Sequence, residues 1–325
     1  MKTKNKIVSN HDRNNGIPFD ADLFKDISIN RSAVERRAAT LAGRRSVKKE
    51  WQAAWLLKAL TCIDLTTLSG DDTQSNVLRL SAKAKSPVRL DILEAMGMQE
   101  AQIQVGAVCV YHNFIKDAVK GLEGSSIPVA AVSTGFPAGN IPLQEKIKQI
   151  ELSVAAGAKE IDIVVSRNLV LNSDWKGLYD EVAACRKACG DAHMKTILAT
   201  GEIPTYTKVA KASWVSMMAG SDFIKTSTGK EPVNATIPVS LVMIRAIRGY
   251  HELTGYKVGF KPAGGIGKAK QAVNWLVLIK EELGNDWLSP DLFRFGASSL
   301  LGDIERQLEH FVTGRYSASF RHPMG

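Results

Sequence analysis

The chain has 325 residues, of which 45% are hydrophobic and 23% are charged, a composition typical of a folded globular protein. This composition excludes a collagen-like or coiled-coil fibre and a chain that is disordered throughout. The long charge-free stretch at residues 125–144 is interrupted by Gly, Pro, Ser, Thr and Asn, so it does not predict a membrane-spanning helix. No apolar segment follows the first lysines, and we therefore expect a cytoplasmic protein without a secretory signal.

Positive charge is concentrated at the start of the chain. The formal net charge is +9, and residues 1–50 hold twelve basic side chains against six acidic ones. A basic arm can attract nucleic acid, but the same composition is typical of a solvated tail or helix face. We therefore do not expect nucleic acid to be the main partner. The mildly positive remainder of the chain would attract small phosphorylated substrates.

The cysteines and histidines show no pattern of a metal site. Cys62, Cys109, Cys185 and Cys189 form no CxxC pair, and none of the six histidines belongs to an HExxH motif. Buried thiols are the ordinary interpretation of such cysteines in an intracellular chain. The sequence thus predicts neither a metal nor a disulfide.

The first 57 residues are expected to form an arm and a helical extension beside the main body. Residues 1–30 are polar, contain an Asn-Asn-Gly turn and a proline, and are typical of a loose arm. Ser32 and Glu35 fit a capping box that would start a helix. The run from Val34 to Leu60 then has helical spacing, and we expect it to pack on the main body.

From residue 58 onward, short apolar runs alternate with stretches of helical period. The runs that predict strands are Cys62–Leu65, Val105–Tyr111, Pro128–Ser133, Glu160–Val165, Lys195–Thr200, Ser221–Lys225, Lys257–Lys261 and Leu292–Phe295. Helical stretches between them include Leu143–Ala156, Trp175–Ala188, Tyr206–Met218, Pro238–Tyr250 and Lys268–Leu283. Eight βα units of roughly 33 residues favour an α/β fold of the closed (β/α)8 barrel type. A doubly wound parallel sheet stays open as the alternative, although no GxGxxG fingerprint follows the first run.

Charged side chains stand near the ends of several predicted strands. The first run contains Asp64, the fourth contains Asp162, and the sixth and seventh end in Lys225 and Lys261. In a barrel enzyme, catalytic side chains project from these carboxyl-terminal ends. Two buried lysines and an aspartate are costly unless they are paired, so we expect Lys225, Lys261 and Asp162 to face one another.

This trio suits Schiff-base chemistry on a carbonyl substrate. A free lysine has a pKa of about 10.4, and burial together with a neighbouring ammonium group lowers that pKa and frees a nucleophilic amine. A nearby carboxylate can transfer the protons. Alternatively, each lysine pairs with a different acid and does no chemistry. Two lysines on adjacent strands, each followed by a glycine-rich turn, favour the catalytic interpretation.

Glycine-rich turns follow the last three predicted strands. They are Ser227–Lys230, Gly264–Gly265 and Gly296–Ser299. Glycine lets backbone N–H groups approach an anion, and loops after the seventh and eighth strands often bind phosphate in such barrels. Ordinary turn chemistry would also place glycine and serine there. Together with the lysines, these turns predict an enzyme that acts on a phosphosugar carbonyl.

The motifs at these strand ends resemble the deoxyribose-phosphate aldolase family. The matching segments are Ile63–Leu68, Val108–Tyr111, Glu160–Val165, Phe223–Lys230, Gly259–Gly265 and Phe293–Leu300. The resemblance covers about residues 58–311 in order, and the two lysine motifs are specific to the family. The long helical extension and Gly-Arg-Tyr at 314–316 look more like animal members than short bacterial ones.

The resemblance implies a class I aldolase that reversibly cleaves 2-deoxy-D-ribose 5-phosphate to D-glyceraldehyde 3-phosphate and acetaldehyde, without metal or organic cofactor. Lys225 matches the Schiff-base lysine, Lys261 the lysine that lowers its pKa, and Asp162 the carboxylate that transfers protons. The residues that match substrate and phosphate contacts are Asp64, Cys109, Thr228, Gly229, Lys230, Gly264, Gly265, Ser298 and Ser299. The implied partners are small phosphosugars and aldehydes, and the family suggests a homodimer.

The chain departs from the pattern of the family at two places. Many relatives carry an arginine after the second glycine-rich turn, where this chain has Gly267 and then Lys268, so Lys268 would have to substitute in part. Bacterial relatives end in a tyrosine thought to reach the active site, and Tyr316 is the nearest candidate here.

Three segments are expected from these observations: residues 1–57 as arm and helical extension, 58–311 as the aldolase barrel, and 312–325 as a tail. Two hypotheses compete with the deoxyribose-phosphate aldolase. One is a different Schiff-base enzyme on the same barrel, and the other is a binding role for the basic arm.

Overall fold

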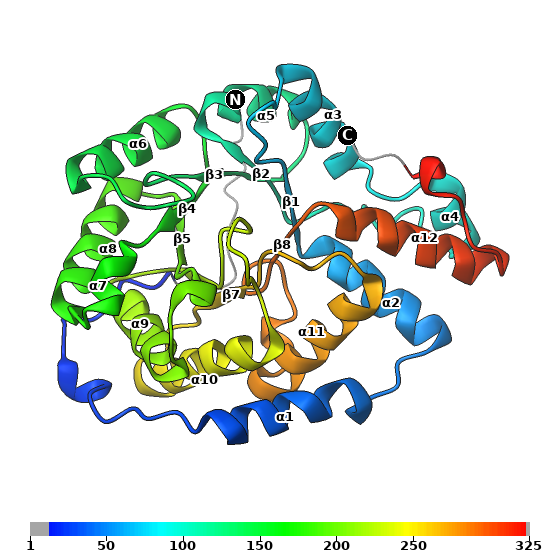
Figure 1. Ribbon diagram of the computed structural model, residues 1–325. Helices are drawn as coiled ribbons and strands as arrows, with labels where there is room; N and C mark the ends of the chain where they lie inside the picture. The colour runs from blue at the N-terminus through cyan, green and yellow to red at the C-terminus, as the bar shows by residue number, and fades with distance from the viewer. Residues whose placement is uncertain (1–12, 323–325) are drawn as a thin grey trace.

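The computed structural model describes residues 13–322, which form an eight-stranded parallel barrel surrounded by helices (Figure 1). The strands are β1 (Ile63–Thr66), β2 (Ala107–Tyr111), β3 (Val129–Val132), β4 (Glu160–Val164), β5 (His193–Ile197), β6 (Phe223–Lys225), β7 (Gly259–Lys261) and β8 (Phe295–Ala297). Neighbours in the order β7-β6-β5-β4-β3-β2-β1-β8 are paired, and parallel bridges Phe260–Phe293 and Ala263–Gly296 join the two ends. The barrel is therefore nearly closed, and the predicted (β/α)8 fold is confirmed over the doubly wound sheet.

Helices between the strands and after the last one cover the outside of the barrel. They are α3 (Gln74–Lys85), α4 (Leu90–Ala95), α5 (Ile115–Gly121), α6 (Leu143–Ala155), α7 (Arg167–Leu171), α8 (Trp175–Cys189), α9 (Tyr206–Met218), α10 (Ile237–Thr254), α11 (Ala269–Leu283) and α12 (Ser299–Thr313). Alternate strand residues face this helix layer or the barrel interior. None of the helices within residues 13–322 is long and apolar enough to cross a membrane.

The last strand begins later than its pattern predicts. The apolar run at Leu292–Phe295 predicts a strand there, whereas β8 spans Phe295–Ala297. Leu292 and Phe293 are buried, but they belong to the turn before the strand, where the Phe293 N–H donates to the Ser289 carbonyl (2.8 Å). Burial continues through this turn into the strand, so hydrophobicity alone does not mark where the strand starts.

The helical extension consists of two helices rather than one continuous run. They are α1 (Arg31–Arg44) and α2 (Lys49–Thr61), separated by residues 45–48. Helix α1 lies along the outside of α10 and α11, while α2 packs between α11 and α12 (Figure 1). Both helices therefore contact the barrel, and the division of the chain at residues 57 and 311 stays a prediction.

The start of α1 corrects the predicted capping box. Asn30 precedes the helix, and its side-chain oxygen accepts a hydrogen bond from the Ala33 N–H (3.0 Å). Ser32 lies inside the first turn, and Glu35 forms an ion pair with Arg31 (2.7 Å). The capping box was wrong because asparagine, an equally good N-cap residue, stands two positions earlier.

The described part of the predicted loose arm, residues 13–30, is packed on the barrel. Phe24 is 1% exposed and meets the ring of Trp175 edge-on. Asn14 is buried, and its amide donates to two main-chain carbonyl groups of the barrel. The prediction failed here because a few anchoring side chains outweigh the polar composition between them. Residues 1–12, the rest of the predicted arm, lie outside the described residues.

Part of the positive charge of the extension is neutralised by α11. Arg37 and Arg45 form ion pairs with Glu281 at 2.9 and 3.2 Å, and Arg44 lies 3.6 Å from the same carboxylate. These arginines therefore attach the extension to the barrel.

The packing of residues 13–30 leads to a prediction about stability. Replacing Phe24 with alanine should lower the free energy of unfolding by about 3 kcal/mol, because a fully buried aromatic ring is removed. Phe320, which is 82% exposed, provides the matched control, and Phe320→Ala should leave the unfolding curve unchanged. Chemical denaturation followed by tryptophan fluorescence measures both. Equal stability of the two variants would mean that the packed segment contributes nothing to folding.

Candidate active site

The two lysines identified in the sequence lie side by side at the ends of neighbouring strands. Lys225 ends β6, Lys261 ends β7, and the two are partners in the parallel register. Asp162 of β4 lies between them, and its Oδ2 accepts a hydrogen bond from each Nζ at 2.7 Å. All three side chains are buried. The fold therefore brings the expected trio together inside the barrel.

A second set of charges extends this trio toward the amino-terminal ends of the strands. Lys195 of β5 donates to Asp162 Oδ1 (3.1 Å) and to the carboxylate of Glu160. Arg294, directly before β8, donates to Glu160 Oε1 (2.9 Å) and to Asp64. No sequence pattern above singles out Glu160, Lys195 or Arg294. One signal was present, since side chains two apart on a strand face the same side and Glu160 stands two residues before Asp162.

Asp64 belongs to this buried charge cluster. One of its carboxylate oxygens accepts a hydrogen bond from Lys261 and the other accepts one from Arg294. The side chain is fully buried, and it does not line the open pocket described below. Any effect of Asp64 on a substrate would therefore be exerted through Lys261.

The environment shifts the pKa values of the two lysines of the trio in opposite directions. Burial lowers the pKa of Lys225; Asp162 raises it, but Lys261 lowers it further, and the pKa lies below its ordinary value. Burial also opposes the charge on Lys261, yet Asp162 and Asp64 outweigh burial and raise its pKa. Lys225 contacts one carboxylate whereas Lys261 contacts two. The geometry thus favours a neutral amine at Lys225 beside a permanent ammonium group at Lys261.

Asp162 is held in its ionised form. Burial would raise the pKa of Asp162, but Lys195, Lys225 and Lys261 together lower it well below its ordinary range. A carboxylate of this kind can accept a proton from an adjacent ammonium group and return it to a substrate oxygen.

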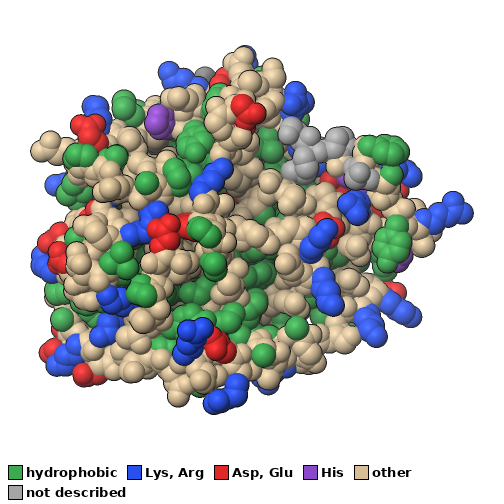
Figure 2. All heavy atoms as spheres, viewed as in Figure 1, with side chains coloured by type: hydrophobic (Ala, Val, Ile, Leu, Met, Phe, Trp, Pro, Cys, Tyr) green, Lys and Arg blue, Asp and Glu red, His purple; other side chains and the backbone are tan. Residues whose placement is uncertain are grey.

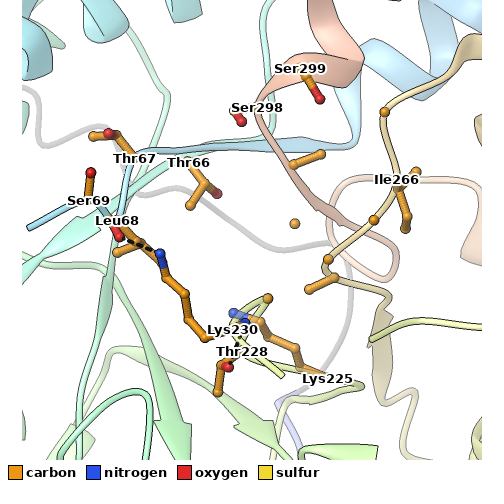
Figure 3. Close-up of a pocket in the computed structure, with 17 residues that line it drawn as sticks. Thr66, Thr67, Leu68, Ser69, Lys225, Thr228, Lys230, Ile266, Ser298 and Ser299 are labelled. Carbon is orange, nitrogen blue, oxygen red and sulfur yellow. Dashed lines mark hydrogen bonds between the residues drawn. The ribbon is translucent and has the colours of Figure 1, made fainter. Parts of the chain in front are cut away.

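An open pocket of about 520 Å³ leads from the surface to Lys225 (Figure 3). It is lined by Thr66, Thr67, Leu68, Ser69, Lys225, Thr228, Gly229, Lys230, Ala263, Gly264, Gly265, Ile266, Gly267, Gly296, Ala297, Ser298 and Ser299. Of the buried trio, Lys225 alone lines the pocket. Ser298 and Ser299 lie on the opposite side of it (Figure 3). On the molecular surface, hydrophobic side chains lie in a hollow near the middle of the face, with Lys and Arg side chains around it (Figure 2).

The turn after β6 is closed by the carboxylate of Glu231. This carboxylate accepts hydrogen bonds from the N–H groups of Thr228 (3.1 Å) and Gly229 (3.2 Å) and from the Thr228 hydroxyl (2.8 Å). The Gly229 amide, expected to contact phosphate, already has an acceptor. Lys230 Nζ instead reaches across the mouth and donates to the Leu68 carbonyl (2.9 Å), the dashed line in Figure 3. This turn therefore offers the ammonium group of Lys230 to an anion.

The turns after β7 and β8 form the other wall of the pocket. Gly264 and Gly265 have positive φ angles of 82° and 77°, and a Cβ on Gly264 would lie 2.5 Å from the Asn234 side chain. Ser298 precedes α12 and Ser299 begins it, so the positive end of this helix meets the pocket. Hydroxyl and N–H donors at a helix N-terminus are suited to bind a phosphate group.

Cys109 of β2 is buried inside the barrel. It packs in a small apolar cluster with Ala107, Ala130 and Val132. Burial raises the pKa of its thiol, which therefore stays protonated and weakly nucleophilic. These features agree with a packing role beside the lysines rather than with a nucleophile.

Gly267, where many relatives carry an arginine, lines the pocket, whereas the two candidate substitutes, Lys268 and Tyr316, lie outside it. Lys268 Nζ is 3.6 Å from Asp303, and Lys268 does not line the pocket, so it does not replace the missing arginine there. Tyr316 is 80% exposed and stacks on His310 with ring centroids 4.3 Å apart. The tail thus presents no tyrosine to Lys225 in this structure, as far as residue 322.

A (β/α)8 barrel with a buried, paired lysine at the base of a pocket lined by glycine-rich turns and serines is the architecture of a barrel aldolase. Residues 58–300 match the family described as "DeoC/LacD family aldolase". The chain belongs to this family of aldolases.

Relatives agree with this assignment, and a solved structure agrees with the fold. The chain is 61% identical to mouse deoxyribose-phosphate aldolase over 311 residues, which cover 95% of this chain and 98% of the relative. It is 59% identical to the human protein of the same name over 313 residues, covering 96% and 98%. The structure also resembles a tetrameric deoxyribose phosphate aldolase from Aeropyrum pernix, with a TM-score of 0.57, 21% identity and coverage of 81% and 98%. The resemblance to the family seen in the sequence is confirmed.

Proposed function

We propose that the protein is a deoxyribose-phosphate aldolase that reversibly cleaves 2-deoxy-D-ribose 5-phosphate to D-glyceraldehyde 3-phosphate and acetaldehyde through a Schiff base on Lys225. The observation that carries this proposal is the Lys225 amine, which has a lowered pKa, lies 2.7 Å from Asp162 and faces an open pocket. The substrate is supported by the relatives named above, at 61% and 59% identity.

The reaction begins on the aldehyde carbon C1 of the open-chain sugar. The neutral Nζ of Lys225 attacks C1, and the aldehyde oxygen takes up a proton from solvent to give a carbinolamine. Asp162 accepts a proton from the amine and returns it to the C1 hydroxyl, which leaves as water. The product is a protonated Schiff base, in which C1 is joined to Nζ by a double bond.

The positively charged Schiff base withdraws electrons from the sugar chain, and the C2–C3 bond is cleaved as a result. As the C3 hydroxyl gives up its proton, the C2–C3 bond breaks and its electron pair moves toward the iminium nitrogen. D-Glyceraldehyde 3-phosphate leaves, and a two-carbon enamine stays on Lys225. Protonation of the enamine carbon and addition of water then release acetaldehyde and the free amine. The contact of Asp162 with the Lys225 nitrogen supports a role for this carboxylate in the proton transfers at that nitrogen.

The phosphate group would bind on the wall opposite the amine. Ser298 and Ser299 stand there at the start of α12, across the pocket from Lys225 in Figure 3. Lys230 adds a positive charge at the mouth. An extended five-carbon chain would join the two ends, with its aldehyde at Lys225 and its phosphate at the serines.

The proposed reaction belongs to the intracellular degradation of deoxyribose phosphates. All four cysteines are buried free thiols, which suits a reducing compartment such as the cytoplasm. The family resemblance suggests a homodimer, which stays a prediction.

Trapping of the Schiff base tests the proposed mechanism directly. Incubation with acetaldehyde and sodium borohydride should leave an ethyl group on Lys225, which peptide mass spectrometry locates. Lys268, an exposed lysine outside the pocket, serves as the internal reference for non-specific labelling. Labelling spread over surface lysines with Lys225 untouched would overturn the assignment. A substrate series then separates this activity from that of another Schiff-base aldolase, since acetaldehyde as product or donor defines the proposed reaction.

The charge at the mouth of the pocket should contribute to phosphate binding. Lys230→Met is expected to raise KM for 2-deoxyribose 5-phosphate about tenfold with little change in kcat, because one charge-assisted contact is lost. Lys268→Met is the matched control, since Lys268 faces Asp303 outside the pocket. Steady-state kinetics measure both variants. A tenfold effect in Lys268→Met instead would relocate the phosphate contact to the position of the missing arginine.

A further inference from the structure

The charge cluster in the barrel contains more cations than carboxylates. Within the described residues, the carboxylates linked in this cluster are Asp64, Glu160 and Asp162, and the basic groups linked to them are Lys195, Lys225, Lys261 and Arg294. All seven side chains are buried. Three negative charges face four basic groups, so one basic group can lose its proton and leave the cluster electrically neutral.

Of the four basic groups, Arg294 cannot lose its proton. Guanidinium groups stay charged in proteins. Burial would lower the pKa of Arg294, but Glu160 and Asp64 outweigh burial and raise it. Its position is fixed by hydrogen bonds to Asp64, to both oxygens of Glu160 and to the Pro290 carbonyl. Arg294 therefore supplies a permanent positive charge to the cluster.

We propose that Arg294 is a positioning residue of the aldolase reaction, and that its guanidinium group holds Asp64 and Glu160 so that Lys225 is the group that gives up its proton. This inference rests on the proposed function of Lys225. Arg294 occupies one oxygen of Asp64 and bonds to Glu160, which also holds Lys195. With two of the three carboxylates shared in this way, Asp162 is the remaining carboxylate for Lys225.

The charged and titratable groups around Lys225 and Arg294 predict how the loss of Arg294 changes the protonation of Lys225. Lys225 is faced by Asp162, Lys261 and Cys109, from strands β4, β7 and β2. Arg294 is faced by Asp64, Glu160 and the thiol of Cys62, from β1, β4 and the end of α2. Removal of Arg294 leaves three carboxylates for three lysines. The cluster is then neutral when Lys225 is protonated, so the ammonium form is favoured.

Arg294 lines a cavity at the opposite end of the barrel from the substrate pocket. This cavity has a volume of about 630 Å³, and Glu160, His193 and Arg294 line it. Arg294 does not line the pocket that contains Lys225. A change at Arg294 can therefore alter the protonation of Lys225 without removing a contact to the substrate.

The pH dependence of Schiff-base trapping with acetaldehyde and borohydride at Lys225 tests this inference. In Arg294→Met, the midpoint of the rate against pH should move upward by about one pH unit, which lowers trapping at neutral pH about tenfold. Arg294→Lys retains the charge and should keep the midpoint near that of the wild type. In both cases circular dichroism checks that the barrel is folded.

Removal of a carboxylate from the cluster should move the midpoint in the opposite direction to the loss of Arg294. Glu160→Gln is nearly isosteric and leaves two carboxylates for four basic groups, so the midpoint should move downward. The double variant Arg294→Met/Glu160→Gln has two carboxylates and three lysines, and its midpoint should return toward the wild-type value. If Arg294→Met fails to fold, the midpoints of Glu160→Gln and of the double variant still test the role of Arg294.

The outcomes distinguish this inference from the proposed function. Absence of trapping at Lys225 in the wild type would overturn the proposed function itself. Normal trapping in the wild type, with midpoints that do not move in Arg294→Met or Glu160→Gln, would overturn only the role of Arg294. The role of Arg294 would also be overturned if the midpoint of the double variant moved further than that of Arg294→Met. Structural damage from two substitutions would add up, whereas the proposed charge balance returns the midpoint toward the wild-type value.

Discussion

The Lys225→Met variant is expected to lose essentially all aldolase turnover while keeping its fold. The amine of Lys225 is the nucleophile of the proposed reaction, and the methionine side chain is of similar length without an amine. Loss of a covalent nucleophile leaves the contributions of binding and electrostatics alone, so we expect kcat to fall by about 10⁴-fold or more. A coupled assay for D-glyceraldehyde 3-phosphate measures the loss.

The loss of turnover in Lys225→Met is interpreted with a test of its fold and with a second lysine variant of the same pocket. Circular dichroism and chemical denaturation should show a folded barrel, because Lys225→Met removes a basic group from a cluster that has one in excess and leaves no carboxylate without a partner. Asp162 keeps Lys195 and Lys261 as partners. Lys230→Met serves as the comparison, since it removes a lysine from the same pocket but not the nucleophile. Substantial turnover in a folded Lys225→Met protein would contradict the Schiff-base assignment.

The positions of Lys225 and Lys261 could be predicted from the sequence because parallel strands obey simple geometry. Each lysine ends a short apolar run, and ends of parallel strands meet at one rim of a barrel. Asp162 could be added because a buried carboxylate is the least costly partner for two buried ammonium groups. The distance of 2.7 Å from Asp162 Oδ2 to the Nζ of each lysine agrees with this expected pairing.

Arg294 and Lys195 could not be found by the same reasoning. Arg294 lies just before β8, in a run whose apolar residues predict a strand that begins earlier than the observed one. Lys195 opens the predicted fifth run, where a lysine usually marks the solvated start of a strand, but β5 already begins at His193. An error of two residues in a strand boundary is enough to hide a buried charge.

The packing of residues 13–30 could not be predicted from the sequence for a different reason. Composition describes residues 13–30 as polar, but Phe24 and Asn14 decide their structure through contacts with distant parts of the barrel. Such contacts leave no periodic pattern in the sequence. The capping box failed for a local reason, since Asn30 and Ser32 are both acceptable N-caps and only the geometry of the first turn selects between them.

The Lys261→Leu variant is expected to shift the pH dependence of catalysis upward. Lys261 is a permanent cation that shares Asp162 Oδ2 with Lys225, and the Nζ of each lysine lies 2.7 Å from that oxygen. Without it, Lys225 loses a repulsive neighbour and becomes the closest remaining cation to Asp162 Oδ2. Both changes favour the protonated, unreactive form of Lys225 and raise its pKa.

The rate should therefore rise with pH through a higher midpoint than in the wild type. A shift of about two pH units would lower kcat/KM near neutral pH about a hundredfold, and much of the activity should return in alkaline buffer. Lys261→Arg retains the positive charge and should shift the profile less, which separates the loss of charge from the loss of shape. Borohydride trapping across the same pH range shows whether the midpoint belongs to Lys225. An active Lys261→Leu protein with an unchanged profile would mean that burial alone lowers the pKa of Lys225, and that the second lysine serves another purpose in the barrel.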